Sequence, residues 1–187
     1  MGRPKALLEV RGVRILDRLI DELVPSFDEV IVSAAPREAE TFDIEGLLKK
    51  KPQAAVLRRD HDAFRGPAAA LVAALQAAQH PYVFVCSCDL PFLQRSIAQA
   101  LTEQLDDFDA VIPVVGGRLQ PLCAAYRTGC AEVLAPALSK YRRLVDLVEQ
   151  LRVRRVEEQF LQQFDPELRS FIDVDTPEDY QRALRLG

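Results

Sequence analysis

The chain has 187 residues, of which 49% are apolar and 28% charged, and this composition excludes disordered, collagen-like and low-complexity classes. We expect residues 1–187 to form a single domain, because that length is enough to bury a sizeable core. The formal charge of −4 argues against general nucleic-acid binders and anionic-membrane binders, since both need a basic surplus. The four cysteines lack the spacing of a zinc ligand set and are expected to be buried thiols in a reducing cytoplasm.

Membrane targeting is not expected. The chain begins with Met1 and Gly2 and shows no apolar signal segment. The uncharged stretch 66–88 is interrupted by His80 and Pro81, so we interpret it as a buried helix followed by a buried strand. These features predict a cytoplasmic protein.

Helical and strand-like patterns alternate along the chain. Apolar residues at helical spacing predict helices, and short apolar or β-branched runs predict strands. The first helices are expected at residues 15–24 and 44–50, after Gly66 and Pro67, and at 96–105; strands are expected at 29–34, 54–57, 82–86 and 110–114. Strands that are apolar on both faces indicate a mainly parallel sheet covered on both sides, so the predicted fold is a Rossmann-like three-layer α/β/α sandwich.

The pattern changes after residue 115. Gly116 and Gly117 predict a hairpin turn that leads into a strand at 122–126. Helices are expected at 132–138 and 142–150 and a strand at 152–156. Thr176 is the expected N-cap of a last helix, with Pro177 at its first position and Asp179 at its third.

Candidate site residues follow the strands. Right-handed crossovers bring the carboxyl ends of the strands to one rim, where α/β sheets bind ligands. Asp89 follows strand 82–86 and is suited to hold Mg²⁺ on phosphates, although an Asp that caps the next helix is an equal alternative. Asp60 ends a second strand, and Gly66 opens a helix whose N–H groups suit an anion.

Charged residues near the two ends of the chain are further candidates. Lys5 is a flexible cation that suits a triphosphate, although a surface lysine is the commoner case. In a strand, Asp173 and Asp175 would lie on one face, where they would share a cation or bind donors; alternatively Asp175 only helps to start the last helix. No Ser–His–Asp or Cys–His set is apparent. The residues alone thus indicate an α/β enzyme that binds a phosphorylated ligand with Mg²⁺.

Five short motifs, in order along nearly the whole chain, resemble those of the molybdenum cofactor guanylyltransferase family (molybdopterin-guanine dinucleotide biosynthesis protein A), within the larger nucleotidyltransferase fold. They are the opening Met-Gly-Arg-Pro-Lys-Ala-Leu-Leu at residues 1–8, Gly-Pro-Ala-Ala-Ala at 66–70, Cys-Asp-Leu-Pro-Phe at 88–92, the segment with Gln-Pro-Leu at 118–126 and Asp-Val-Asp-Thr-Pro-Glu-Asp at 173–179. The resemblance implies transfer of GMP from GTP to the terminal phosphate of molybdopterin, with release of pyrophosphate.

The resemblance also implies roles for individual residues. Asp89 would bind Mg²⁺ between the nucleotide phosphates, and Lys5 would neutralise charge on the triphosphate; these two are the candidate catalytic residues. Lys5, Asp89, Asp60, Gly66 and Ser33 form the predicted nucleotide-binding set. Asp173 and Asp175 are assigned to the acceptor side. The implied partners are GTP, molybdopterin, and molybdoenzymes or other cofactor-synthesis proteins, with no nucleic acid and no membrane.

The sequence departs from the family in three places. The strand and glycine-rich loop that open the family pattern do not precede Met1, so we expect two open strand edges and hypothesise that a longer reading frame encodes them. Ala70 replaces a glycine. Asp173 and Asp175 replace asparagines and are like the residues of molybdopterin cytidylyltransferases. The alternatives are therefore a CTP-dependent enzyme and a catalytically silent binding or scaffold protein.

Overall fold

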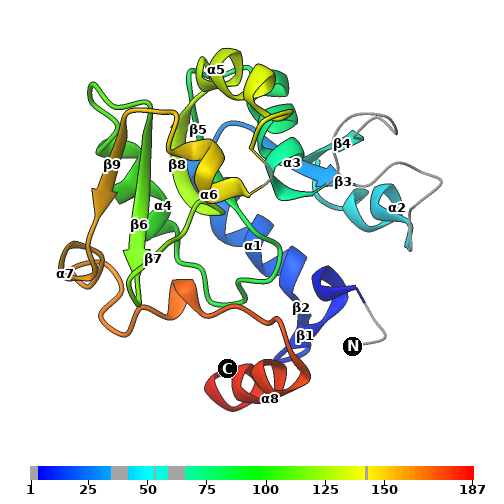
Figure 1. Cartoon of the computed structure of the whole chain (residues 1–187). Coiled ribbons are helices and arrows are strands. Elements are labelled where there is room, and N and C mark those ends of the chain that lie inside the picture. Colours follow the sequence, from blue (N-terminus) through cyan, green and yellow to red (C-terminus); the bar gives the residue numbers. More distant parts are fainter. Residues whose placement is uncertain (1–3, 35–41, 53, 59–65, 142) are drawn as a thin grey trace.

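The computed structural model describes residues 4–34, 42–52, 54–58, 66–141 and 143–187 (Figure 1). Helices and strands alternate through most of these residues. The strands are β1 (Glu9–Val10), β2 (Val13–Arg14), β3 (Val30–Ala34), β4 (Ala54–Arg58), β5 (Tyr82–Cys86), β6 (Ala110–Val115), β7 (Arg118–Leu119), β8 (Cys123–Arg127) and β9 (Val153–Val156). The α-helices are α1 (Ile15–Leu23), α2 (Ile44–Leu48), α3 (Pro67–Ala77), α4 (Arg95–Glu103), α5 (Cys130–Ala137), α6 (Leu144–Val148), α7 (Glu158–Leu161) and α8 (Pro177–Leu186). Short 3₁₀ turns lie at η1 (Lys5–Leu7), η2 (Val24–Ser26) and η4 (Arg169–Phe171).

The largest sheet has five strands in the order β5-β8-β6-β7, with β9 on β6. β8 is antiparallel to both β5 and β6, so β5, β6 and β9 all run in one direction and β8 runs against them. The predicted α/β class is confirmed, and three of the strands share the expected direction. The pairings are nevertheless mixed, because the hairpin after β6 returns the chain as β7 and then as β8, inserted between β5 and β6.

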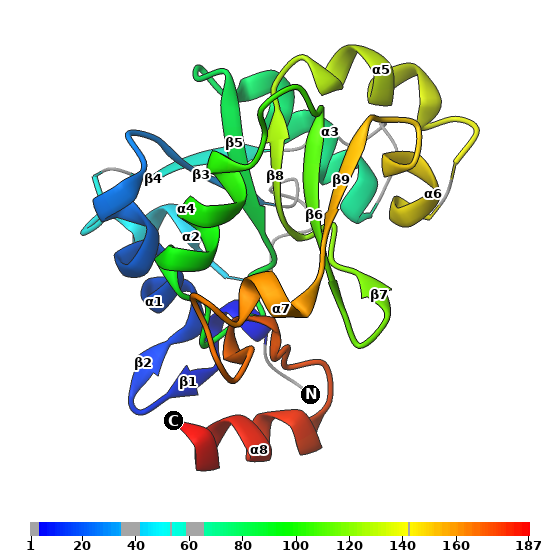
Figure 2. The same ribbon diagram turned by 90° about the vertical axis from the view of Figure 1, so that its left-hand side faces the viewer.

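Helices cover both faces of this sheet, which makes three layers (Figure 2). Alternate residues of a strand point to opposite faces. Ala110 and Ile112 of β6 pack with Leu71 and Leu75 of α3, whereas Val111 between them packs with α4. α5 and α6 lie on the same face as α3. The predicted three-layer sandwich is therefore present, and its core is centred on β6 and β8.

A second, smaller sheet consists of β3 and β4, which are parallel in register from Val30 opposite Ala54 to Ala34 opposite Arg58. Figure 1 shows this pair at one side of the molecule, away from β6 and β9. Within the described residues, β3 pairs only with β4, and β5 pairs only with β8. One edge of each strand is thus left without a partner strand, which agrees with the two open edges expected from the sequence.

The last helix, α8, packs beside the first hairpin, β1–β2 (Figures 1 and 2). The Tyr180 hydroxyl donates to the Glu9 carbonyl over 2.7 Å, and Ala183 belongs to the same buried cluster as Val10 and Ile15. The predicted cap of α8 is confirmed, because Thr176 and Asp179 form a reciprocal capping box. Residues from the two ends of the chain therefore lie side by side.

None of the helices in the described parts of the chain is long and apolar enough to cross a membrane. In particular α3 and β5 are separate short elements, as predicted for the uncharged stretch 66–88.

Candidate active site

Lys5, Asp89 and Asp175 come together from three distant parts of the chain, and we call this cluster the Lys5 centre. Lys5 is the first residue of η1, Asp89 follows β5, and Asp175 precedes α8. The Lys5 Nζ donates to the Asp89 Oδ2 over 3.1 Å and also to the Asp175 Oδ1. The Asp89 carboxylate is mostly buried, at 15% exposed, whereas the Asp175 carboxylate is largely exposed. The cluster therefore has one closed side and one side that faces solvent.

The charges of this cluster affect one another. Partial burial lowers the pKa of Lys5, but its hydrogen bonds to Asp175 and Asp89 outweigh burial, so the net pKa is raised and the ammonium is charged at neutral pH. Burial, followed by repulsion from Asp175 and Asp89, raises the pKa of Asp173. One ammonium thus faces an excess of carboxylates, and such a site favours an additional cation.

Backbone contacts hold the two acidic segments together. The Val174 N–H donates to the Asp89 carbonyl over 3.0 Å, and the Val174 side chain is fully buried between the exposed Asp173 and Asp175. The predicted alternation is therefore present, although residues 172–175 form an extended segment rather than a strand of a sheet. The carboxylate of Asp175 is placed at the Lys5 centre by this burial and by the cap of α8 that follows.

Other predicted site residues lie on the small sheet and on α3. Ser33 is in β3, and its buried Oγ has no hydrogen-bond partner among the described residues. Gly66 precedes α3 with a φ of +104°, a conformation suited to glycine, and no side chain of the described residues caps the helix there. Asp60 lies outside the described residues. Lys5 is in direct contact with Asp89 and Asp175, whereas within the described part of the chain neither Ser33 nor Gly66 forms a hydrogen bond with them.

The side chains at the Lys5 centre fit a divalent cation of the magnesium type. Mg²⁺ prefers oxygen ligands and is commonly held by one or two carboxylates together with substrate phosphates. Asp89 and Asp175 supply carboxylates on either side of the Lys5 ammonium. Among the described residues, no group of three His, Cys, Asp or Glu side chains has the arrangement of a metal site. Two carboxylates are the number with which Mg²⁺ is commonly held when phosphates of a substrate complete its ligands.

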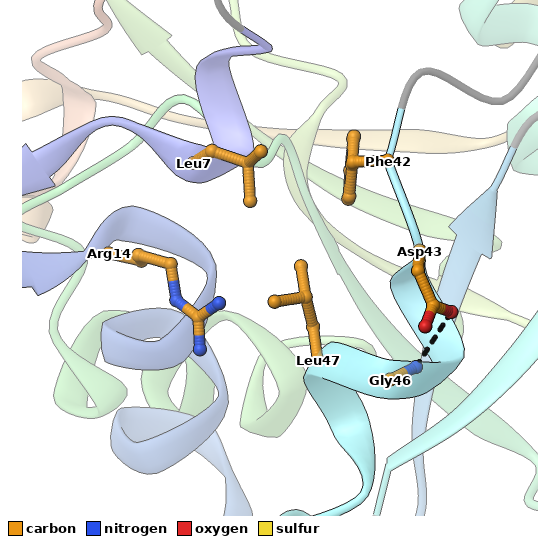
Figure 3. Close-up of a pocket in the computed structure, with 6 residues that line it drawn as sticks. All are labelled: Leu7, Arg14, Phe42, Asp43, Gly46 and Leu47. Carbon is orange, nitrogen blue, oxygen red and sulfur yellow. Dashed lines mark hydrogen bonds between the residues drawn. The ribbon is translucent and has the colours of Figure 1, made fainter.

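A cavity of about 640 Å³ lies beside η1, the turn that begins with Lys5 (Figure 3). Leu7, Arg14, Phe42, Asp43, Gly46 and Leu47 line it. Asp43 accepts a hydrogen bond from the Gly46 N–H over 2.9 Å and so caps α2, and the Arg14 guanidinium donates to Asp17 over 2.6 Å. These polar groups already have partners, and the lining does not include the carboxylates of the Lys5 centre.

Two findings could not be inferred from sequence motifs. The bond from Lys5 to Asp175 joins residues that are 170 positions apart. Cys88 is exposed beside Asp89, so the expectation of four buried thiols is wrong for this residue; Cys123 and Cys130 are buried as predicted. Cys86 is half-buried, and burial of its thiol raises the pKa of that group to about 12.

Comparison with known proteins assigns the chain to a family of nucleotidyltransferases. The family described as MobA-like NTP transferase domain matches residues 1–156, and the chain belongs to that family. Molybdenum cofactor guanylyltransferase of Desulfosudis oleivorans is 32% identical over 97% of this chain and 86% of its own length. A protein of Pelotomaculum thermopropionicum, named as a probable molybdenum cofactor guanylyltransferase, is also 32% identical, over 98% of this chain and 85% of its own.

Solved structures agree on the fold. Molybdopterin-guanine dinucleotide biosynthesis protein A from Archaeoglobus fulgidus has a TM-score of 0.83 at 24% identity and covers 99% of this chain and 91% of its own. The 2-C-methyl-D-erythritol 4-phosphate cytidylyltransferase of Thermus thermophilus has a TM-score of 0.71 at 23% identity, over 98% and 93% of the two chains. The Rossmann-like nucleotidyltransferase fold predicted from the sequence is thereby confirmed.

Proposed function

We propose that this protein transfers GMP from GTP to molybdopterin, with release of pyrophosphate. The observation that carries the proposal is the convergence of Lys5, Asp89 and Asp175 in a chain that is 32% identical to a molybdenum cofactor guanylyltransferase over nearly its whole length. The proposed enzyme acts in the cytoplasm, as one nucleotidyltransferase domain. Its reaction needs no protein nucleophile, because a phosphate oxygen of the acceptor attacks the α-phosphorus of GTP in line.

In this proposal Asp89 and Asp175 would hold Mg²⁺, which would supply positive charge to offset that of the nucleotide phosphates. The Lys5 ammonium is charged at neutral pH and neutralises the triphosphate as negative charge moves to the leaving pyrophosphate. When the triphosphate binds, its oxygens replace the carboxylates as acceptors of the Lys5 N–H groups. Lys5 is thus oriented before the ligand arrives, and the cost of ordering its side chain is reduced.

Nucleotide contacts are proposed for the other predicted residues. The Ser33 hydroxyl, buried without a partner in the described region, is available to bond a polar group of the nucleotide. The α3 N-terminus after Gly66 offers N–H groups for an anion, and within the described ranges no side chain caps them. Asp60 is proposed to contact the nucleotide as well. Asp173 is proposed to lie on the acceptor side, whereas Asp175 belongs to the Lys5 centre.

Isothermal titration calorimetry with GTP and with CTP, each in the presence of Mg²⁺, tests the proposal. We expect binding of GTP in preference to CTP, and tighter CTP binding would support the cytidylyl alternative. The titration is repeated on a chain extended upstream of Met1 through its reading frame. Binding by the extended chain alone would support the hypothesis of a missing opening strand, and no binding by either would leave the scaffold alternative.

Asp89→Asn is the matching test of chemistry. The amide has nearly the shape of the carboxylate but lacks its charge, so we expect Mg²⁺-dependent GMP transfer to fall by about 1000-fold, as when a group that stabilises transition-state charge is removed. Asp106→Asn, which removes a surface partner of Arg154, is the control. Unchanged transfer by the Asp89→Asn protein would refute the metal role.

A further inference from the structure

Asp165 and Ser170 are the two polar residues that are buried among the described residues, at 1% and 0% exposed. Both lie between α7 and α8, in a segment without a sequence motif. The Ser170 N–H donates to the Asp165 Oδ2 over 2.7 Å. Burying a carboxylate costs free energy unless hydrogen bonds compensate. Folding therefore pays a desolvation cost for Asp165 that an apolar residue at the same position would not have.

The hydrogen bonds of this pair lead towards the Lys5 centre. The Ser170 Oγ accepts from the Gln94 N–H over 3.1 Å. Gln94 is the N-cap residue of α4, and its own side chain makes no capping bond. The Ser170 hydroxyl therefore satisfies a backbone donor just before α4, in the loop that runs from Asp89 to that helix.

A second bond links the same two segments. The Val174 N–H donates to the Asp89 carbonyl. Val174 comes four residues after Ser170, and Asp89 comes five residues before Gln94. The loop 89–94 and the segment 170–174 therefore lie antiparallel to each other, with one hydrogen bond joining them at each end. Leu90 and Leu93 of the loop are buried in one cluster with Val174, so the space between the two bonds is filled by apolar packing.

Asp165 fixes the start of this attachment. Its carboxylate accepts a hydrogen bond from the Ser170 N–H inside the 3₁₀ turn η4, whose preceding residue Leu168 has a left-handed φ of +52°. Residues rarely adopt this conformation unless surrounding contacts hold it. Ser170 is the middle residue of η4, and this conformation places its hydroxyl within hydrogen-bond distance of the Gln94 N–H.

We propose that Asp165 and Ser170 are positioning residues, which set how the loop carrying Asp89 lies against the segment carrying Asp173 and Asp175. The inference rests on the proposed function in one respect, the role of Asp89 and Asp175 in holding a divalent cation. The pair itself touches no reacting group. Its effect passes through the two backbone attachments to the carboxylates on either side of Lys5.

Binding of Mn²⁺ to the purified full chain, followed by electron paramagnetic resonance, tests the proposal without turnover. Mn²⁺ that still binds to the Asp89→Asn protein is assigned to sites other than the Lys5 centre. We expect Ser170→Ala and Asp165→Leu to raise the half-saturating Mn²⁺ concentration about 10-fold, the scale seen when outer groups of a metal site are removed. Asp165→Asn keeps an oxygen that accepts from the Ser170 N–H and should restore binding close to that of the parent.

Thr102→Val is the matched control. It removes a hydroxyl from α4 that donates to the Ala98 carbonyl over 2.8 Å, on the same helix but away from Gln94. A purely structural role of Ser170 would lower the melting temperature and leave the Mn²⁺ half-saturation unchanged. That result in folded Ser170→Ala protein would overturn the proposal, and this variant decides the test if Asp165→Leu does not fold.

Amide hydrogen exchange without metal separates this inference from the proposed function. If the parent binds no Mn²⁺ at Asp89, the proposed metal role fails, and exchange at Val174 then decides whether the pair positions the two segments. We expect Ser170→Ala to accelerate exchange of the Val174 amide at least 10-fold. Unchanged exchange there would overturn the inference.

Discussion

In the part of the chain that the structure describes, the two parallel strand pairings lie in different surroundings. β6 and β9 belong to the five-stranded sheet, where Ala110, Val111 and Ile112 are completely buried between helices. β3 and β4 form a pair of their own, and every residue of β3 remains half-buried although most of its side chains are apolar. Parallel strands are normally covered on both faces and joined to further strands, since two strands alone are only marginally stable.

This difference separates the Lys5 centre from Ser33, which is one of the proposed nucleotide contacts. The buried cluster that contains Leu90, Leu93, Val174 and Cys123 anchors the Lys5 centre to β8 of the large sheet. Ser33, by contrast, is on the pair with fewer buried contacts. The segments that carry Asp89 and Asp175 are therefore packed more closely than the strand that carries Ser33, and we expect binding of the nucleotide to stabilise the small sheet.

Lys5→Met tests the proposed role of the Lys5 ammonium in GMP transfer. Methionine keeps most of the side-chain length but loses the charge that Asp89 and Asp175 share, so we expect kcat/KM for GMP transfer to fall about 100-fold or more. Lys51→Met is the control, because Lys51 is also a lysine in an ion pair, with Asp21, but away from the centre. A change of less than twofold in Lys5→Met would exclude the proposed role of the ammonium.

A pair of isoleucine substitutions tests the contrast between the sheets directly. Ile112→Ala in β6 removes a completely buried side chain, and we expect it to lower the free energy of unfolding by about 4 kcal/mol. Ile31→Ala in β3 should cost about 1 kcal/mol, because that side chain is already half-exposed. Urea denaturation measures both. Equal losses would show that the small sheet is as tightly packed as the large one.

Thr176→Ala tests the cap that holds the segment beside the Lys5 centre. The Thr176 hydroxyl accepts from the Asp179 N–H and also donates to its carboxylate, so we expect a loss of about 1 kcal/mol in the free energy of unfolding. Thermal denaturation with Thr176→Ser as the conservative control measures it. A melting temperature equal to that of the parent would show that the cap contributes no stability.

Asp173→Asn should have the smallest effect, and its sign depends on pH. A carboxyl group whose pKa is raised on folding binds protons more tightly in the folded state, so its ionisation destabilises the fold as pH rises through the folded pKa. The variant should therefore be more stable than the parent at pH 7, by less than about 1 kcal/mol because the group is exposed. The difference should disappear below the ordinary aspartate pKa, and a parent that is more stable at pH 7 would contradict this sign.

The sequence was sufficient for elements with a long periodic pattern. The apolar face of α1, the uninterrupted strand β5 and the Thr176 cap are each carried by local residues, and the structure has all three. The hairpin β1–β2 was missed because each strand has only two residues, although Gly12 at its turn has a φ of +74°. A pattern that short has no detectable period.

Long-range polar contacts were the part of the site that sequence reasoning did not find. Asp89 was identified from its place after a strand, but nothing local to Lys5 indicates a bond with Asp175. Asp165 is followed by a proline and a glutamate, a composition typical of an exposed turn. Its burial depends on η4 and on α4, which are brought together only by the tertiary fold.

The distance along the chain between Lys5 and Asp175 has a consequence for synthesis. Chains are made from the amino terminus, and domains fold as their residues emerge. When residues up to β9 have been released, every strand of the large sheet is present, but the second carboxylate that bonds Lys5 and the helix that packs on β1–β2 are not. The centre is therefore assembled last, and a polypeptide cut short near its carboxyl end would retain most of the fold while lacking a complete charge cluster.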